Sequence, residues 1–150
     1  MDAETTSAHN LEINRVYDAE RARVFRAWTE PDAIKQWFGP ESCSVLDARV
    51  DLRVDGEYHF KLRGQEIPEI WLTGVFKEIT PPEKLVYTWK WLTEPMSALG
   101  ETLVTVEFLE RGEKTEVKLT HTGFSVVEAV TEHNEGWSGT LDRLAAFLTG

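Results

Sequence analysis

The chain contains a single cysteine, so Cys43 has no partner for an internal disulfide and no companion for a thiolate metal cluster. Long apolar runs are missing as well, since none approaches the ~18 residues that a membrane span needs. Residues 1–10 are polar and acidic, without the basic start and apolar stretch of a signal peptide. We therefore expect a cytoplasmic protein that does not insert into membranes, with a disordered tail over residues 1–10.

Positive charge is also scarce, because 16 lysines and arginines stand against 26 aspartates and glutamates, which gives a net charge of −10. Recognition of nucleic-acid phosphates or anionic lipids draws on clustered positive charge, so the composition argues against both kinds of partner. Aromatic residues, by contrast, are plentiful. Six tryptophans, seven phenylalanines and three tyrosines can fill a core and also line a cavity.

The first third of the chain has the pattern of one strand followed by two short helices. Leu11, Ile13 and Val16 suggest the strand, and Asp18 is suited to cap the helix that comes next. Pro31 fits the first turn of a second helix, which Gly39 and Pro40 end. These elements precede a longer stretch with a different period.

Residues 45–122 have the pattern of an antiparallel meander, because apolar and polar residues alternate between turn signals. Asp55-Gly56 marks one of the hairpin turns. The pattern does not decide which residues of 70–79 face inward. Six strands are expected, at residues 45–54, 57–63, 70–79, 85–91, 103–110 and 115–122.

The last segment is helical, with a capping box formed by Ser125 and Glu128 and an apolar stripe from Val127 to Leu148. As one helix, residues 126–148 span about 34 Å, which matches the diameter of a domain of this size. A curved, twisted sheet can wrap such a helix, whereas a flat one leaves its ends bare. The sequence therefore predicts an α+β helix-grip fold: a curved antiparallel sheet of about seven strands around a long C-terminal helix, with two short helices after strand one.

Several short motifs follow one another in a fixed order: Val24-Phe25-Arg26-Ala27-Trp28-Thr29-Glu30-Pro31, Trp37-Phe38-Gly39-Pro40, Val54-Asp55-Gly56-Glu57-Tyr58, Gly74, Pro81-Pro82-Glu83-Lys84-Leu85-Val86-Tyr87-Thr88-Trp89, Thr115-Glu116-Val117, His121 and Gly136-Trp137. In this order they resemble the SRPBCC superfamily, which includes START domains and the birch-pollen allergen. Within it, the chain is similar to the bacterial activator of heat shock protein 90 ATPase homologue-like family. The resemblance covers about residues 11–148, so we place a single domain at residues 11–150. Asp55 departs from the family, which often has a second glycine there, but an Asp-Gly turn tolerates the change.

The resemblance implies a hydrophobic cavity between the sheet and the C-terminal helix, and it implies no single activity. Together with the aromatic inner face, it leads us to expect a protein that binds a small apolar or amphipathic molecule. Fatty acids, isoprenoids, aromatic metabolites and polyketides all remain open as ligands. The expected ligand-binding residues are Phe38, Tyr58, Phe60, Leu72, Tyr87, Trp89, Val106, His121, Trp137 and Leu141.

Two features of the cavity region have two interpretations each. Gly136 and Gly139 flank Trp137 inside the helix at a cost of up to about 1 kcal/mol each relative to alanine. They either allow close packing on the sheet or open space for a ligand. His121 and His133 are either hydrogen-bonded structural residues or a pair that binds a polar group and transfers protons.

The sequence offers little for cofactors. It has no His-x3-His pair, and Glu132 and Glu135 are expected to point away from His133 on the helix. It also has no phosphate-binding glycine loop, dinucleotide motif or nucleophile elbow. We therefore expect no metal, nucleotide or flavin and assign no catalytic residue. A metal-free lyase, cyclase or hydrolase reaction in the same cavity is one alternative, with His121 and a tyrosine as proton carriers.

The second alternative is a co-chaperone that stimulates a heat-shock chaperone ATPase, as the family name suggests. A protein interface needs exposed apolar anchors, and Trp71, Met96 and Leu99 are the candidates. Met96 and Leu99 lie in the long connection over residues 93–101, which is alternatively a lid over the cavity mouth. We expect a monomer or a weak homodimer.

Overall fold

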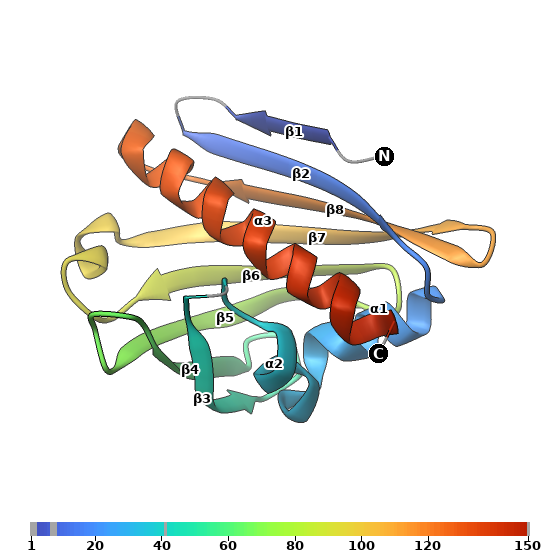
Figure 1. The fold of residues 1–150 in the computed structure, drawn as a ribbon, viewed down its shortest axis with the longest axis horizontal. Coiled ribbons are helices and arrows are strands. Elements are labelled where there is room, and N and C mark those ends of the chain that lie inside the picture. The colour runs from blue at the N-terminus through green and yellow to red at the C-terminus, as the bar shows by residue number, and fades with distance from the viewer. Residues whose placement is uncertain (1–2, 7–8, 41, 150) are drawn as a thin grey trace.

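An eight-stranded antiparallel sheet dominates the computed structural model, which describes residues 3–6, 9–40 and 42–149 (Figure 1). The strands lie in the order β1-β2-β8-β7-β6-β5-β4-β3, so β3 to β8 form the expected meander and β2 extends it beyond β8. Their bounds are β1 Ala3–Thr6, β2 Asn10–Tyr17, β3 Ser44–Val50, β4 Glu57–Arg63, β5 Ile70–Thr80, β6 Lys84–Trp91, β7 Glu101–Arg111 and β8 Lys114–Thr122.

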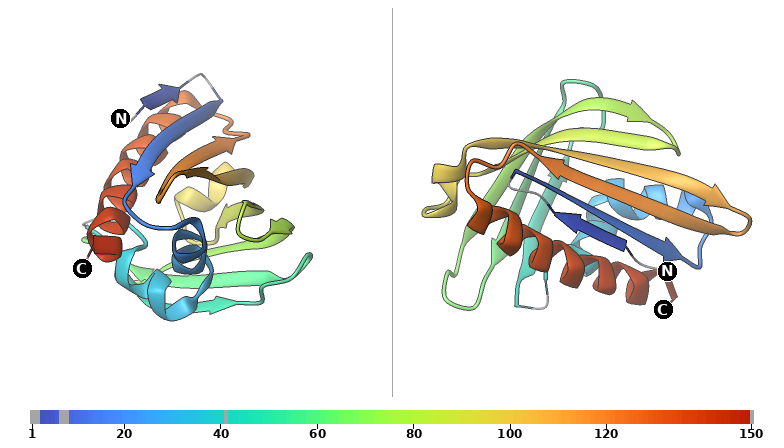
Figure 2. Two further views of the ribbon diagram at one scale, coloured as in Figure 1. Left: turned by 90° about the vertical axis from the view of Figure 1, so that its right-hand side faces the viewer. Right: turned by 90° about the horizontal axis from the view of Figure 1, so that it is seen from above.

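The long helix α3 (Val127–Thr149) lies across one face of this sheet, and the sheet curves around it (Figure 2). Two register shifts, between Val45 and Asp47 and between Phe76 and Glu78, mark irregularities of the kind that bend strands. The helix-grip fold predicted from the sequence is therefore confirmed. None of the helices in the described ranges is long and apolar enough to cross a membrane.

Two short helices, α1 (Arg21–Thr29) and α2 (Pro31–Trp37), connect β2 to β3, as predicted. Pro31 opens α2, where its missing N–H costs no helical hydrogen bond. The cap of α1 differs from the prediction, because Glu20 and not Asp18 is the N-cap residue, and its side chain makes no capping hydrogen bond. The buried residues of both helices pack against the sheet, α1 mainly against β7 and α2 against β3.

The N-terminal segment also differs from the expectation of a disordered tail over residues 1–10. Ala3–Thr6 forms β1, which pairs antiparallel with β2 so that Glu4 lies opposite Ile13. Residues 1–2 and 7–8 lie outside the described residues. The segment Ala-Glu-Thr-Thr has no apolar alternation, so periodicity alone does not reveal a strand here.

Three further details refine the predicted elements. The third strand ends at Val50 and not at residue 54, because a turn with Asp55 at φ 68° carries the chain into β4. In β5 the structure decides the orientation left open before, since Ile70, Leu72 and Phe76 face the core. Val127 is 54% exposed at the start of α3 and lies outside the buried stripe.

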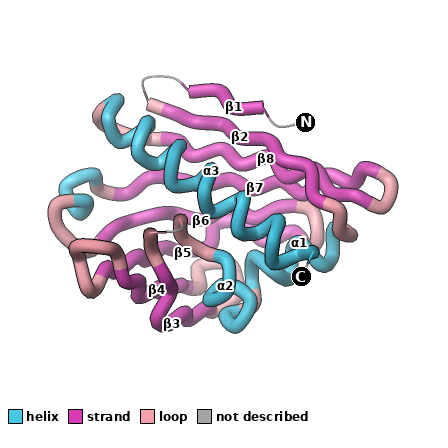
Figure 3. The backbone as a smooth tube through the Cα atoms, viewed as in Figure 1, coloured by secondary structure: helices cyan, strands magenta, loops and turns pink. Residues whose placement is uncertain are grey.

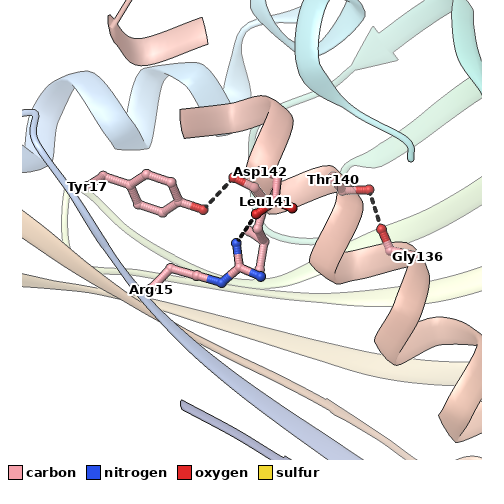
Figure 4. Close-up of polar contacts among 6 residues, drawn as sticks. All are labelled: Arg15, Tyr17, Gly136, Thr140, Leu141 and Asp142. Carbon is pink, nitrogen blue, oxygen red and sulfur yellow. Dashed lines mark hydrogen bonds and ion pairs between the residues drawn. The ribbon is translucent and has the colours of Figure 1, made fainter. Parts of the chain in front are cut away.

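Polar contacts fix α3 against β2 (Figure 4). The Tyr17 hydroxyl donates to the Leu141 carbonyl at 3.0 Å, and the Arg15 guanidinium pairs with Asp142 at 2.6 Å. Within the helix, the Thr140 hydroxyl donates to the carbonyl of Gly136, one turn earlier, at 2.7 Å. The two contacts with β2 set the rotation of α3, and thereby help decide which of its side chains face the space between helix and sheet.

A close crossing in the middle of the sheet involves Gly74 of β5, which pairs with Tyr58 of β4. The Tyr58 ring passes over Gly74, and its hydroxyl donates to the Thr88 carbonyl of β6 at 2.6 Å. A Cβ atom at position 74 would overlap the Thr88 carbonyl oxygen and lie 2.5 Å from the Tyr58 ring. Only glycine leaves room for this three-strand contact.

Candidate ligand cavity

A cavity of about 210 Å³ lies between α3, the inner face of the sheet and the loop after α2. Its wall combines this loop with strands β4 to β6, the 3₁₀ helix η1 (Met96–Leu99) and α3. Figure 3 shows η1 at the end of the sheet where α3 begins. The lining residues are Phe38, Gly39, Pro40, Cys43, Leu62, Ile70, Trp89, Trp91, Met96, Leu99, Glu132, His133, Gly136, Trp137 and Thr140.

Aromatic rings form much of this wall. The Trp89 ring lies 5.1 Å from that of Trp137 and 5.4 Å from that of Trp91, the latter edge to face. Phe38 meets Trp137 edge to face at 6.1 Å. Rings held against one another in this way cannot turn freely, so the cavity has a stiff wall that presents ring faces and edges.

His121 is fully buried behind this wall and has both ring nitrogens engaged. Trp137 Nε1–H donates to His121 Nδ1 at 3.0 Å, so the proton of the neutral ring is on Nε2 and is directed to Thr102 Oγ1 at 2.7 Å. The Thr102 hydroxyl in turn donates to the Trp89 carbonyl at 3.2 Å. The structure therefore places His121 in a hydrogen-bonded chain between α3 and the sheet, away from the cavity.

We predict that His121 makes the protein less stable at mildly acidic pH. Burial, and secondarily the neighbouring His133, holds the pKa of His121 well below its ordinary value. Below pH ~6.5 the unfolded chain then takes up a proton that the folded chain refuses, at up to about 1.4 kcal/mol per pH unit. Between pH 7 and pH 5.5 the free energy of unfolding from urea titrations should fall by about 1 kcal/mol more in the wild type than in His121→Gln. Parallel pH profiles would contradict this assignment.

His133 lies at the cavity rim and joins α3 to β6. Its Nδ1–H donates to the Ala129 carbonyl at 2.8 Å, which leaves Nε2 to accept the Trp91 indole N–H at 3.0 Å. Burial lowers its pKa, although the Ala129 carbonyl and Glu132 act in the opposite direction. Both ring nitrogens of His133 make hydrogen bonds within the cavity wall. His121 and His133 therefore fit the interpretation as hydrogen-bonded structural residues.

The three indoles of the wall differ in whether their N–H groups have a hydrogen-bond acceptor. Those of Trp91 and Trp137 donate to histidines, whereas Trp89 Nε1 is buried and has no hydrogen-bond partner among the described residues. An unpaired buried donor costs about 1–3 kcal/mol.

This difference predicts unequal costs for two chemically identical substitutions. Trp137→Phe strands the buried Nδ1 of His121, while Trp89→Phe removes a donor that bonds to nothing. Both remove the same atoms, so the loss of packing is matched. We expect urea unfolding to show Trp137→Phe as the less stable variant by about 1–3 kcal/mol. Equal losses would mean that the His121 bond contributes nothing.

The two glycines around Trp137 prove to have different surroundings. A Cβ atom at Gly139 would lie 3.4 Å from Pro40 Cβ, so this glycine serves the close packing of α3 on the loop after α2. A Cβ atom at Gly136 would have nothing within 4 Å. Gly136 shares a helix face with two other lining residues, Glu132 and Thr140, so its missing side chain widens the cavity.

Arg143, one turn beyond Thr140, holds the loop after α2. Its Nη1 lies 2.8 Å from the Gly39 carbonyl oxygen and 3.1–3.4 Å from those of Phe38, Pro40 and Cys43. A planar guanidinium presents several donors in a fixed fork, which suits a cluster of carbonyl groups. The loop wall of the cavity is thereby fastened to the same helix that forms the opposite wall.

A second, much smaller cavity of about 20 Å³ lies deeper, beneath α1 and α2. Tyr58 and Tyr87 line it together with Phe38, Phe60 and Trp89. Burial raises the pKa of both tyrosines, and the Tyr87 hydroxyl accepts the Trp28 indole N–H at 3.2 Å. This space is large enough for about one water molecule, so the tyrosines belong to the core and not to the main cavity.

The ten residues expected to bind ligand therefore fall into three groups. Phe38, Trp89 and Trp137 line the main cavity. Tyr58, Phe60 and Tyr87 line the small one. The remaining four are buried in the core and line neither of these two cavities: Leu72, Val106, His121 and Leu141.

The lining residues that the expected set omitted come mostly from loops and from α3. Met96 and Leu99 were recognisable as apolar residues in a long connection, and the structure brings both to the rim. Glu132 also lines the cavity, although the helical spacing suggested that it points away from His133. Leu62 alternates like any core residue and the orientation of Ile70 was left open by the pattern, so no signal in the sequence identifies either as a lining residue.

Metal ligation has no support in the described part of the chain, which contains no group of three His, Cys, Asp or Glu side chains placed to hold an ion. Cys43 is a free, half-buried thiol in the cavity wall.

Comparison with known proteins places this geometry in a family. Residues 18–149 match the family model described as Activator of Hsp90 ATPase homolog 1-like protein. A crystal structure of a protein from Nitrosomonas europaea is 25% identical, with a TM-score of 0.81 and 97% of each chain covered. The AHSA1 protein from Silicibacter pomeroyi is 24% identical, with a TM-score of 0.81, over 93% of this chain and 97% of that one. A solution structure from Arthrobacter aurescens shares the fold at 21% identity, with a TM-score of 0.85, over 98% of this chain and 91% of that one. The search of curated proteins found no match.

Proposed function

The chain belongs to the Activator of Hsp90 ATPase homolog 1-like family, and we propose that it binds a small molecule of one or two rings in the cavity between α3 and the sheet. The observation that carries this proposal is the cavity itself, about 210 Å³ of space walled by Phe38 and three indoles. Sites for small molecules are concave and mostly apolar, with a few polar groups, which matches this lining.

The volume narrows the ligand classes that the sequence left open. An apolar cavity of about 150 Å³ is enough to bind benzene. A space of about 210 Å³ therefore suits one ring with a short substituent or two fused rings. A long fatty acid or isoprenoid chain exceeds it unless α3 or η1 moves away from the sheet.

The test is a thermal-shift panel with toluene, indole, 2-phenylethanol and naphthalene, with palmitate as the long-chain comparison. Binding at 100 times Kd stabilises by about 2.7 kcal/mol, which raises Tm by roughly 5 °C or more for a chain of this size. We expect such shifts with the ring compounds, accompanied by a change in tryptophan emission, and none with palmitate. Unchanged Tm and emission across the whole panel would refute the proposal. Native mass spectrometry of freshly purified protein adds a search for a co-purified ligand.

The two alternative functions receive less support from the described residues. For chaperone assistance, the anchors Met96 and Leu99 are used in the cavity rim, and the Trp71 indole donates to Glu69 at 2.6 Å. For catalysis, His121 was the proposed proton carrier, and both of its nitrogens are occupied. Ligand binding is the function that the cavity residues can perform while they keep their present contacts.

A further inference from the structure

The charge in the cavity lining is of one sign, negative. Glu132, exposed at the rim, is the one charged residue among those that line the cavity, and no lysine or arginine of the described chain is part of that lining. His133 beside it has a lowered pKa and is neutral near pH 7. A ligand entering here therefore meets a carboxylate and no fixed positive charge.

Arg143, which holds the loop wall of the cavity, is turned away from a ligand. Arg143 directs Nη1 to the backbone carbonyls of Phe38, Gly39, Pro40 and Cys43, so these contacts occupy it behind the loop. An anionic ligand would thus enter an apolar cavity without a cationic partner, and burying an unpaired charge is costly.

The aromatic wall favours the opposite charge. Indole rings attract ammonium groups, and Trp89, Trp91 and Trp137 all line this one cavity. The whole chain adds a net charge of −10, which raises the local concentration of cations around any entrance.

We propose that the cavity selects ring compounds that carry a primary amine, with the ring against the wall formed by Trp89 and Trp137 and the ammonium group at Glu132. This inference rests on the proposed function and adds the charge class of the ligand. The ring supplies apolar burial, and the rim carboxylate with the indole faces supplies the preference for a cation.

The test uses three probes with the same ring and a two-carbon substituent: 2-phenylethylamine, 2-phenylethanol and phenylacetate. Their dissociation constants are measured by calorimetry at pH 7 and 0.15 M salt. We expect the amine to bind at least tenfold more tightly than the carboxylate, with the alcohol in between. In Glu132→Gln the affinity for the amine should fall to within about threefold of the affinity for the alcohol measured on the same variant.

The control variant is Glu135→Gln, which removes the same charge from an exposed position of α3 outside the cavity lining. It should keep the full preference for the amine, so that a general effect of net charge is separated from a local one. Equal binding of amine and carboxylate, or the same loss in both variants, overturns the charge inference. If toluene and indole still bind in that case, the proposed function stands; if no ring compound binds, the proposed function fails with it.

Discussion

Gly74→Ala is expected to cost at least about 3 kcal/mol, a large part of the 5–15 kcal/mol that keeps a domain of this size folded. The added methyl group overlaps the Thr88 carbonyl oxygen and the Tyr58 ring, and the overlap with backbone cannot be relieved by a rotamer change. To make room, β5 must separate from β6 or the Tyr58 ring must leave its position over the strand. Urea unfolding followed by tryptophan fluorescence measures the loss.

The companion variant Tyr58→Phe separates the two parts of this contact. It removes the 2.6 Å hydrogen bond to the Thr88 carbonyl and leaves the ring over Gly74, so the expected cost is only about 1–2 kcal/mol. A loss below 1 kcal/mol for Gly74→Ala would show that the sheet accommodates the methyl group, and that this glycine is dispensable.

The second large effect concerns binding and not folding. Gly136→Leu should abolish uptake of indole or 2-phenylethanol while the protein becomes more stable. The four added carbon atoms enter space that has no other atom within 4 Å of the Cβ position, and they fill much of a cavity of about 210 Å³. Leucine also replaces a glycine inside a helix, which favours folding by about 0.8–1 kcal/mol.

Gly139→Ala is the matched control for this substitution. It gives a similar gain in helix propensity, but Gly139 is not itself a lining residue and its methyl group only makes van der Waals contact with Pro40, so indole binding should persist. The measurements are calorimetric titration and thermal unfolding of both variants. A Gly136→Leu protein that is stable and still binds indole with unchanged affinity would place the site elsewhere.

The fold could be predicted from the sequence because its elements are long and strongly patterned. The alternation over residues 57–63 and 85–91 and the helical stripe near the C-terminus each come from burial of one face, which is a local signal. Boundaries depended on turns, so the third strand was extended past Val50 into residues that turn. The strand at Ala3–Thr6 forms only because β2 offers it a partner, and pairing of that kind has no local signal.

The site was harder to predict, because an inward residue of a helix-grip fold either fills the core or faces the cavity. Leu72 and Trp89 both alternate inward on neighbouring strands, yet only Trp89 lines the cavity. The difference arises from where α3 stands away from the sheet, and this depends on Gly136, on Arg143 and on the loop after α2. Glycines in a helix were the best available signal, although the sequence could not tell that Gly136 opens space while Gly139 permits contact.

The short strand β1 has a consequence for how the protein behaves in concentrated solution. An open sheet ends in two rows of unpaired backbone groups, and such rows are templates for edge-to-edge aggregation. On one side β1 pairs with residues 11–14 of β2, so it covers half of that eight-residue strand. On the other side the register irregularity in β3 and the charges of Asp47 and Arg49 make that edge a poor template. A short strand at one edge and an irregular, charged strand at the other are both poorer templates for edge-to-edge pairing than a long, regular strand would be.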